Sequence, residues 1–302
     1  MNRVAIVIPA YNSAATIGDT LRSIAGCTPD PSLIAVYLAD DASTDDTCKV
    51  AVAAWKGPAP LIVKKAAKNS GERRTINRMF DEIAAECDWA LILHADDLAK
   101  PDWLGAMVRL MNEAGERTAS VCSSYDLLHE DGRVEAGEDI RNSATRVIEG
   151  TPAAVVDTLT RGCWWHISGC AIRLSAFKVI GGFHEEMPQR GDWEWLLRAL
   201  SRGYAIEYAP RTLTLYRLHA ASVSSVSFRT FRDVRETLDV LRLYAGVLPR
   251  RLQTRLYWQN EMLCVRRGAR AISRADARTT LNSLKAAGLV TRHFAKAMTR
   301  RA

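Results

Sequence analysis

Apolar and polar residues follow two patterns along the first half of the chain, one typical of buried strands and the other typical of helices. Short continuous apolar runs, rich in β-branched residues, predict strands buried on both faces. Between them, apolar residues recur every three or four positions, as Ile17, Leu21 and Ile24 do, which predicts helices with one buried face. Strands and helices that alternate in this way predict a mainly parallel sheet with helices on both faces. The expected strands are Val4–Pro9, Leu33–Ala39, Pro60–Lys65 and Trp89–His94, and the expected helices are Ser13–Ala25, Thr44–Trp55, Gly71–Glu86 and one that opens at Pro101.

The pattern changes after about residue 118, where the predicted strands become shorter and less regularly spaced. From Phe228 onward the strand signal disappears and only helical spacing remains. The sequence therefore predicts an α/β domain over residues 1–226, followed by an all-helical C-terminal region over residues 227–302. In the second half of the α/β domain, strands are expected at Ser120–Leu128, Arg133–Glu135, Gly169–Arg173 and Leu213–Leu218, and a helix at Trp193–Ser201.

The composition is that of an ordinary globular protein. Of the 302 residues, 48% are hydrophobic and 25% are charged, which excludes disordered and fibrous classes. No apolar run approaches the ~18 residues of a membrane span, and the N-terminus runs into the first strand without a signal region. Seven cysteines without a Cys-x-x-Cys pair fit buried thiols in a reducing compartment. We therefore expect a cytoplasmic protein.

The net charge of +7 is unevenly distributed. Residues 228–302 carry 17 Lys and Arg against 5 Asp and Glu, a net charge of +12, whereas residues 1–227 carry 24 against 29, a net charge of −5. The basic region has no recognisable nucleic-acid motif, so nucleic acid is not expected as a partner. Two alternatives remain: the region contacts an anionic membrane surface, or it packs on the body with solvated arginines. The membrane contact would lie in Gly288–Ala302, with Leu289, Phe294 and Met298 in the interface and Arg292, Lys296, Arg300 and Arg301 at the headgroups.

Polar residues follow three of the four N-terminal strands at the point where each strand ends. Open α/β sheets bind their ligands at this edge. Two of the three clusters contain paired carboxylates, which repel each other, so a cation or a hydrogen-bonding ligand is the simplest reason to keep them. Any one cluster taken alone would serve equally well as turn residues and helix caps. The clusters are Pro9-Ala10-Tyr11-Asn12, Asp40-Asp41-Ala42-Ser43-Thr44-Asp45 and His94-Ala95-Asp96-Asp97.

These clusters, in this order, resemble the successive signatures of the family 2 glycosyltransferases, which have the GT-A fold. The resemblance covers roughly residues 3–225. It implies a Rossmann-like domain that transfers a sugar, with inversion, from a nucleotide-diphosphate sugar to an acceptor hydroxyl. A UDP-sugar is the first choice of donor, a glycan or lipid-linked molecule is the implied acceptor, and cell-surface polysaccharide or glycoconjugate synthesis is the implied process. The matching segments are Val4–Asn12, Asp40–Thr47, Leu93–Pro101, Gly181–Phe183, Gly191–Arg198 and Tyr216–His219.

The resemblance also implies a divalent cation, Mn²⁺ or Mg²⁺, that offsets the charge growing on the diphosphate leaving group. Asp96 and Asp97 match the family's metal motif, and one is expected to reach the metal while the other reaches the ribose or a metal-bound water. His219 matches a family position near the metal or the diphosphate. His94 stands where the family often has an aspartate, and histidine can also bind a ribose or a metal.

For the nucleotide, the family often has an Arg-Asn pair in the helix after the third strand. In this chain Asn77 is present but Ile76 occupies the arginine position, so Arg73 or Arg74, one turn earlier, is expected to reach the diphosphate. The alternative for these arginines is a solvated helix face. The residues implied in nucleotide-sugar binding are Pro9, Ala10, Tyr11, Asn12, Asp40, Asp41, Asn69, Arg73, Arg74, Asn77, His94 and Asp96.

On the acceptor side, Asp192 matches the general base, which takes the proton of the attacking hydroxyl. Gly191 stands where the family usually has a second acidic residue, and Asp192 would also fit the N-cap of the helix that it opens. Adjacent tryptophans are a common stacking surface for a sugar ring, although they would equally fit a core. The residues expected to bind the acceptor are Trp164, Trp165, His166 and Trp193.

Two other functions compete with the glycosyltransferase. A nucleotidyltransferase would carry a glycine-rich loop with a lysine near the N-terminus, and residues 9–16 contain neither residue. A non-catalytic nucleotide-sugar-binding or scaffold protein of the same fold is favoured by His94 and Gly191 but disfavoured by Asp96, Asp97 and Asp192. An active enzyme would work in the cytoplasm, either free or peripheral on the inner face of the cytoplasmic membrane.

Overall fold

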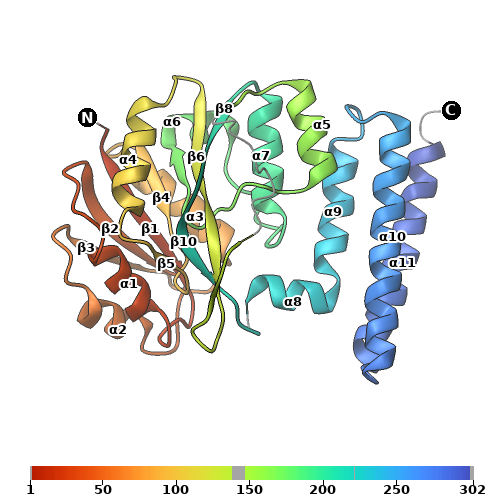
Figure 1. Cartoon of the computed structure of the whole chain (residues 1–302), viewed down its shortest axis with the longest axis horizontal. Helices are drawn as coiled ribbons and strands as arrows, with labels where there is room; N and C mark the ends of the chain where they lie inside the picture. The colour runs from red at the N-terminus through yellow and green to blue at the C-terminus, as the bar shows by residue number, and fades with distance from the viewer. Residues whose placement is uncertain (1, 138–146, 221, 300–302) are drawn as a thin grey trace.

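The computed structural model describes residues 2–137, 147–220 and 222–299, and it confirms an α/β sheet domain followed by a helical C-terminal region (Figure 1). One mixed sheet forms the centre of the domain. In spatial order its strands are β3 (Leu61–Lys65), β2 (Leu33–Asp40), β1 (Val4–Ala10), β4 (Trp89–Ile92), β9 (Ala171–Arg173), β6 (Thr118–Leu128), β10 (Ala205–Arg217) and β5 (Leu98–Ala99), with β7 (Val134–Glu135) beside β6 and β8 (Val147–Ile148) beside β10.

The N-terminal half of the sheet is parallel, as the alternation of strands and helices predicted. Strand β1 pairs in parallel with β2 and β4, and β2 pairs in parallel with β3. Strand β9 runs antiparallel between β4 and β6, after which β6 and β10 are parallel again. Because β1, β2 and β4 point the same way, the polar residues that follow them all emerge at one edge of the sheet.

Helices cover both faces of this sheet, and the alternation of side chains along β1 shows why. Ala5 and Val7 face a core built with α3, α5, α6 and α7, whereas Val4, Ile6 and Ile8 face a core built with α1 and α4. A strand buried on both sides has no polar face, so its sequence is a continuous apolar run. The helices are α1 (Ile17–Ala25), α2 (Thr47–Ala54), α3 (Glu72–Ile83), α4 (Trp103–Glu113), α5 (Pro152–Arg161), α6 (Leu174–Ile180) and α7 (Gly191–Ser201).

Two elements differ from the sequence prediction. Helix α5 was missed, although Thr151 caps it by accepting a hydrogen bond from the Ala154 N–H and Pro152 opens it, both ordinary signals of a helix start. Strand β10 begins eight residues before the expected start at Leu213. Its register shifts between Ala209 and Thr212, which accommodates Pro210 and interrupts the pattern expected of a single strand.

The C-terminal region is helical in the described residues, as predicted, and it packs on the sheet domain (Figure 1). Helices α8 (Val223–Thr230) and α9 (Arg232–Leu243) lead to a long antiparallel pair, α10 (Arg250–Ser273) and α11 (Ala277–Thr299). Helix α8 crosses the expected boundary between residues 226 and 227, and Val240 and Leu241 of α9 join the core of the sheet domain. In the described ranges, no helix is both long enough and apolar enough to cross a membrane.

The membrane contact expected in Gly288–Ala302 is wrong for two of its apolar residues. Leu289 and Phe294 pack, partly buried, against the core shared by α8, α9, α10 and α11, and the Phe294 ring lies 5.8 Å from that of Tyr257. These side chains hold α11 against its neighbours and are not free to enter a lipid surface. The side chain of Met298 and the residues Arg300 and Arg301 lie outside the described part of the structure.

Candidate active site

The loops that follow β1, β2 and β4 lie together at the carboxyl edge of the sheet, as predicted. The Asn12 N–H donates to Ser43 Oγ at 2.9 Å and the Thr44 N–H donates to Asn12 Oδ1 at 2.9 Å, which ties the first two loops together. Thr16 Oγ1 donates to the Ala95 carbonyl at 2.8 Å and so ties the start of α1 to the third loop. Asn12 has a φ of +50°, a conformation that asparagine tolerates well.

Carboxylate and imidazole side chains gather after β4. The donor atoms of His94, Asp96 and Asp97 all lie within 4.8 Å of one another. His219, which comes from the chain after β10, places its Nε2 2.9 Å from Asp96 Oδ2. The structure therefore brings together the four residues for which the sequence suggested a metal or diphosphate role, from two segments more than 120 residues apart in the chain.

Asp97 shows most clearly that this cluster fits a cation. Its side chain is 1% exposed, and Oδ1 accepts the Arg217 N–H at 2.9 Å. Its Oδ2 is buried and has no hydrogen-bond partner in the described residues. Burial, and then the neighbouring Asp96, raise the pKa of the Asp97 carboxyl above its usual range, because both disfavour a second negative charge there. A divalent cation would supply the missing partner, and the mixed oxygen and nitrogen donors suit Mn²⁺ better than Mg²⁺.

Arg217 is part of this site, although the sequence analysis gave it no role. Besides its backbone contact with Asp97, its Nε donates to the Asp96 carbonyl at 2.7 Å. Nη2 lies 3.5 Å from Asp19 at the start of α1. From the end of β10, Arg217 thus holds the side chain of Asp97 and the backbone of Asp96. Its place beside His219 in the matching segment was the available signal.

A chain of charged groups joins the acidic pair to Asp192. His94 Nε2 lies 3.6 Å from Glu72 Oε1, Glu72 Oε1 lies 3.2 Å from Arg73 Nη1, and Arg73 Nη2 lies 3.9 Å from Asp192 Oδ1. Burial lowers the pKa of His94, but the carboxylates of Glu72, Asp97 and Asp96 outweigh it, so the pKa is raised overall. Glu72 was missed by the sequence analysis, because nothing in its own segment marks it.

Asp192 lies in the first turn of α7, one residue inside the helix, so it is not the N-cap. Its side chain is 19% exposed and Oδ1 accepts its neighbour's N–H at 2.8 Å, which leaves the carboxylate accessible and oriented. Close packing explains why the preceding residue, Gly191, is a glycine. A Cβ on Gly191 would lie 3.2 Å from the His184 carbonyl oxygen and 3.3 Å from Arg73 Nε, so a larger residue would have to displace both.

The residues implied in nucleotide binding fall into several groups. Pro9 and Ala10 end β1 in the core, and the Tyr11 ring next to them is 49% exposed. The Asp40 carboxylate is buried, and its Oδ1 lacks a hydrogen-bond partner in the described ranges.

The neighbouring Asp41 instead holds the loop before α3, because its carboxylate accepts the Ser70 and Gly71 N–H groups at 2.7–3.0 Å. Asn69, in that loop, is exposed.

The α3 residues do not form one diphosphate site. Asn77 donates to the Phe183 carbonyl at 2.9 Å and accepts the Phe183 N–H at 2.8 Å, so its amide holds the chain between α6 and α7, and its contact with the nucleotide stays a prediction. Arg73 is buried beside Asp192 and donates to the Pro188 carbonyl at 3.2 Å. Arg74 is exposed and ion-paired with Glu185. Arg73 therefore lies beside Asp192, with its Nη2 3.9 Å from Asp192 Oδ1, and its contact with the diphosphate stays a prediction.

The expectation of an exposed tryptophan surface for the acceptor is wrong. Trp164, Trp165 and Trp193 are 7%, 2% and 4% exposed. Trp165 stacks on Trp195, with ring centroids 5.4 Å apart, and its Nε1 donates to Ser120 Oγ at 2.9 Å. These rings fill the space between the sheet, α5 and α7, and the segment that carries them shows no amphipathic period from which their burial could be predicted.

His166, the remaining predicted acceptor residue, packs against two tyrosines, one of which, Tyr216, directly precedes Arg217. Its ring lies 4.4 Å from Tyr125 and 5.1 Å from Tyr216, centroid to centroid, and Nδ1 lies 2.8 Å from the Ser168 carbonyl. Nδ1 therefore carries the proton and donates, which leaves Nε2 as an acceptor. Burial, and then His94, lower the pKa of His166 to about 4, so the ring is neutral at pH 7. Tyr125 was not predicted as part of this group.

Replacing Trp165 by alanine should lower the free energy of unfolding by about 3–5 kcal/mol, the usual cost of removing a fully buried large aromatic side chain. Urea titration followed by circular dichroism measures it. The matched control is Trp258→Ala, since Trp258 is 62% exposed and its loss should cost about 0.5 kcal/mol or less. Equal stabilities for the two variants would contradict the burial of Trp165.

This protein is an α/β protein of the GT-A class. Three features define the class: the order of the strands, the Asp96–Asp97 pair at the carboxyl edge of the sheet, and Asp192 at the start of α7. Solved structures of the same fold confirm this class. S. aureus TarS 1-349 in complex with UDP-GlcNAc superposes with a TM-score of 0.65 at 17% identity, over 97% of this chain and 81% of that one. The mannosyltransferase PcManGT from Pyrobaculum calidifontis, in complex with GDP-Man and Mn²⁺, superposes with a TM-score of 0.61 at 18% identity, over 98% and 81%.

The sequence comparisons give the family. The profile described as glycosyl transferase family 2 matches residues 5–151, which is the family that the motifs predicted. Among curated proteins, the undecaprenyl-phosphate 4-deoxy-4-formamido-L-arabinose transferase of Sodalis glossinidius is 29% identical over 112 residues, 36% of this chain and 34% of that protein. The succinoglycan biosynthesis protein ExoU of Rhizobium meliloti is 33% identical over 105 residues, 35% of this chain and 29% of that protein. The chain thus spans about a third of the length of these relatives.

Proposed function

We propose that the protein is an inverting glycosyltransferase that moves a hexose-type sugar from a nucleotide-diphosphate sugar to an acceptor hydroxyl. The observation that carries the proposal is the buried carboxylate of Asp97, one oxygen of which has no hydrogen-bond partner in the described residues. It lies beside Asp96, His94 and His219, at the edge of the sheet where this fold binds ligands. The names of similar proteins support it: two solved structures of this fold hold UDP-GlcNAc and GDP-Man, and two curated relatives are named for an undecaprenyl-phosphate transferase and for succinoglycan biosynthesis.

In this proposal the two loops after β1 and β2 take the nucleoside. The exposed Tyr11 ring offers a stacking surface for the base, and the unpartnered Oδ1 of Asp40 offers a buried acceptor for an N–H or a ribose hydroxyl. Asp96 and Asp97, with His94 and His219 beside them, would hold Mn²⁺ or Mg²⁺, which offsets the charge of the diphosphate leaving group. We retain a UDP-sugar as the first donor to test.

Asp192 takes the proton of the acceptor hydroxyl as that oxygen attacks the anomeric carbon. Arg73, 3.9 Å away, holds the carboxylate in place from the α3 side. The neutral His166 and its two tyrosine neighbours offer the polar and aromatic surface that a sugar acceptor needs. A glycan or lipid-linked acceptor in cell-surface polysaccharide or glycoconjugate synthesis agrees with the names of both curated relatives. We place the reaction at the cytoplasmic side of the membrane.

Donor binding tests the first half of this proposal. Isothermal titration of the protein with UDP and with GDP, each with and without Mn²⁺, should show one nucleotide bound more tightly with the metal, because the diphosphate then bridges to the acidic pair. The lack of any nucleotide binding, with or without Mn²⁺ or Mg²⁺, would contradict the assignment of this edge of the sheet to a donor.

We further propose that residues 1–226 hold the donor and the reacting groups, while residues 227–302 support them. The contact that carries this division of roles is Glu236 of α9. Its Oε2 accepts the backbone N–H groups of Gln189 and Arg190, at 2.9 and 2.7 Å, and its side chain is buried. Since these residues directly precede α7, Glu236 positions the helix start that carries Asp192.

Replacing Glu236 by alanine should lower kcat about tenfold or more while the affinity for the nucleotide stays unchanged, because a small displacement of a reacting group is costly and the donor site is untouched. Glu236→Gln keeps an oxygen acceptor and should restore most of the rate. Steady-state kinetics and nucleotide titration on both variants measure this. A wild-type kcat for a folded Glu236→Ala protein would contradict the positioning role.

A further inference from the structure

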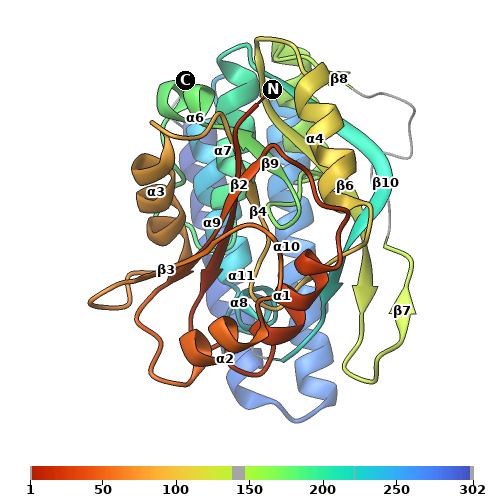
Figure 2. The ribbon, with the colours of Figure 1, turned by 90° about the vertical axis from the view of Figure 1, so that its left-hand side faces the viewer.

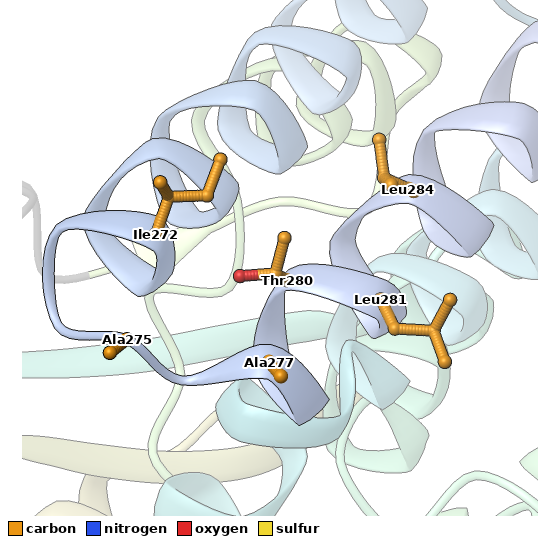
Figure 3. Close-up of a pocket in the computed structure, with 6 residues that line it drawn as sticks. All are labelled: Ile272, Ala275, Ala277, Thr280, Leu281 and Leu284. Carbon is orange, nitrogen blue, oxygen red and sulfur yellow. The ribbon is translucent and has the colours of Figure 1, made fainter.

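An apolar surface lies at the tip of the α10–α11 hairpin, remote in the chain from the proposed site. Ile272, Leu281 and Leu284 are 67%, 52% and 68% exposed. Together with Ala275, Ala277 and Thr280 they line a shallow hollow between the last turn of α10 and the first turns of α11 (Figure 3). Large aliphatic side chains gathered on one exposed surface are uncommon and mark an interaction site.

The charge around this tip is strongly positive. Residues 265–285 contain six Lys and Arg and a single acidic residue. Four of the basic residues, Arg270, Arg274, Arg278 and Lys285, are exposed and come from the same turns as the apolar side chains. The acidic residue, Asp276, caps α11 by accepting the Thr279 N–H at 2.9 Å. Arg267 is ion-paired with Asp233 of α9, so the tip combines exposed aliphatic groups with a net charge of +4 from the other residues of this range.

The tip lies at the same end of the molecule as the carboxyl ends of two strands of the sheet. In both ribbon views the turn between α10 and α11 lies at the lower end of the molecule (Figures 1 and 2). The carboxyl ends of β6 and β10, and helix α8 just after β10, lie at this same end. The acidic pair lies beside the end of β10, since Asp97 accepts the Arg217 N–H and Asp96 Oδ2 lies 2.9 Å from His219 Nε2. A flat surface that contacts the tip would therefore face the end of the molecule that carries the proposed metal site.

We propose that this tip docks the protein on an anionic lipid surface, with Ile272, Leu281 and Leu284 in the interface and the four basic side chains at the headgroups. Aliphatic groups flanked by Lys and Arg are the combination that binds at the lipid–water interface, since each part supplies one of the two attractions. Charge favours this occupant over a second copy of the same tip, because two surfaces of +4 repel each other. The docking itself does not depend on the proposed function. If that function holds, docking turns the site toward a lipid-linked acceptor.

Co-sedimentation of the full chain with vesicles tests the proposal. The vesicles are phosphatidylcholine alone, or phosphatidylcholine mixed with phosphatidylglycerol, at low and at high salt. We expect binding to the anionic vesicles only, weakened by salt, because exposed charges are screened at high ionic strength. Failure to bind anionic vesicles at low salt would overturn the proposal.

Two variants locate the contact. The triple variant Ile272→Ser, Leu281→Ser, Leu284→Ser should reduce vesicle partitioning about tenfold or more, since it removes the apolar part of the contact. The matched control, Val52→Ser with Val179→Ser, changes equally exposed residues on other elements and should bind as the wild type does. Equal partitioning of the triple variant and the wild type would overturn the proposed site.

Two further measurements separate docking from misfolding and from self-association. Nucleotide titration and circular dichroism of the triple variant should match the wild type, so a misfolded variant is recognised and failure of the docking is distinguished from failure of the donor site. Light scattering without vesicles reports self-association. A dimer that the triple variant abolishes, together with no vesicle binding by the wild type, would assign the tip to a second copy of the chain instead.

Discussion

Replacing Asp192 by asparagine should lower the rate of sugar transfer about 10²–10⁴-fold, the usual contribution of a general base. Asparagine has nearly the same shape, and its side-chain oxygen can keep the hydrogen bond from the following N–H that orients Asp192 at 2.8 Å. What the variant loses is the ability to accept a proton. Folding and nucleotide affinity should therefore stay close to those of the wild type.

The control for this experiment is Asp46→Asn, which removes an exposed carboxylate at the start of α2 and should leave the rate unchanged. Single-turnover rates and nucleotide titrations are needed on both variants, so that chemistry is separated from binding. An Asp192→Asn rate within a few-fold of the wild type would remove Asp192 from the mechanism.

Replacing Asp97 by asparagine should abolish most of the metal dependence of nucleotide binding. The variant removes the negative charge but keeps an oxygen for the Arg217 N–H, so the loop should keep its place. We expect the nucleotide affinity in the presence of Mn²⁺ to fall about tenfold or more, toward the value measured without metal. Asp96→Ala should have a similar effect, since it removes the other carboxylate and the partner of His219.

Stability gives the Asp97 experiment an independent check. Without metal, the wild-type protein buries a carboxylate oxygen that has no partner in the described residues, beside a second acid. Neutralising that group should leave the metal-free variant at least as stable as the wild type, while Mn²⁺ should stabilise the wild type alone. Thermal unfolding with and without Mn²⁺ measures both. If Mn²⁺ stabilises the variant as much as the wild type, the cation binds elsewhere.

The sheet and the acidic pair were predictable because their signals are local. A strand buried on both faces is a continuous apolar run, as in Val4–Ala10, and the polar residues directly after such runs must emerge at one edge of a parallel sheet. The same reasoning puts Asp40 and Asp96 at the same edge of the sheet. Helix ends were less accurate, since the chain before α1 forms turns up to Ile17.

The parts that were missed depend on packing between distant segments. Glu72 and Tyr125 reach the site from α3 and β6, and no pattern within those elements marks them, whereas Arg217 of β10 was marked only by its place beside His219 in a matching segment. Trp165 was placed at the surface because adjacent tryptophans suit a sugar ring, but the space between the sheet and α7 needed large side chains and a partner such as Ser120. Burial of this kind is set by tertiary structure and not by the local sequence.

A transfer assay on the purified full chain tests the proposed glycosyltransferase activity most directly. UDP-sugars and GDP-mannose are supplied in turn with Mn²⁺ or Mg²⁺ and with glycan and lipid-linked acceptors, and the anomeric configuration of the product is determined by NMR. We expect a glycosylated product of inverted configuration, which is lost when the metal is chelated and when Asp192 is replaced by asparagine. A protein that binds the nucleotide sugar but forms no product with any donor and acceptor, or forms one with retained configuration, would contradict the proposal.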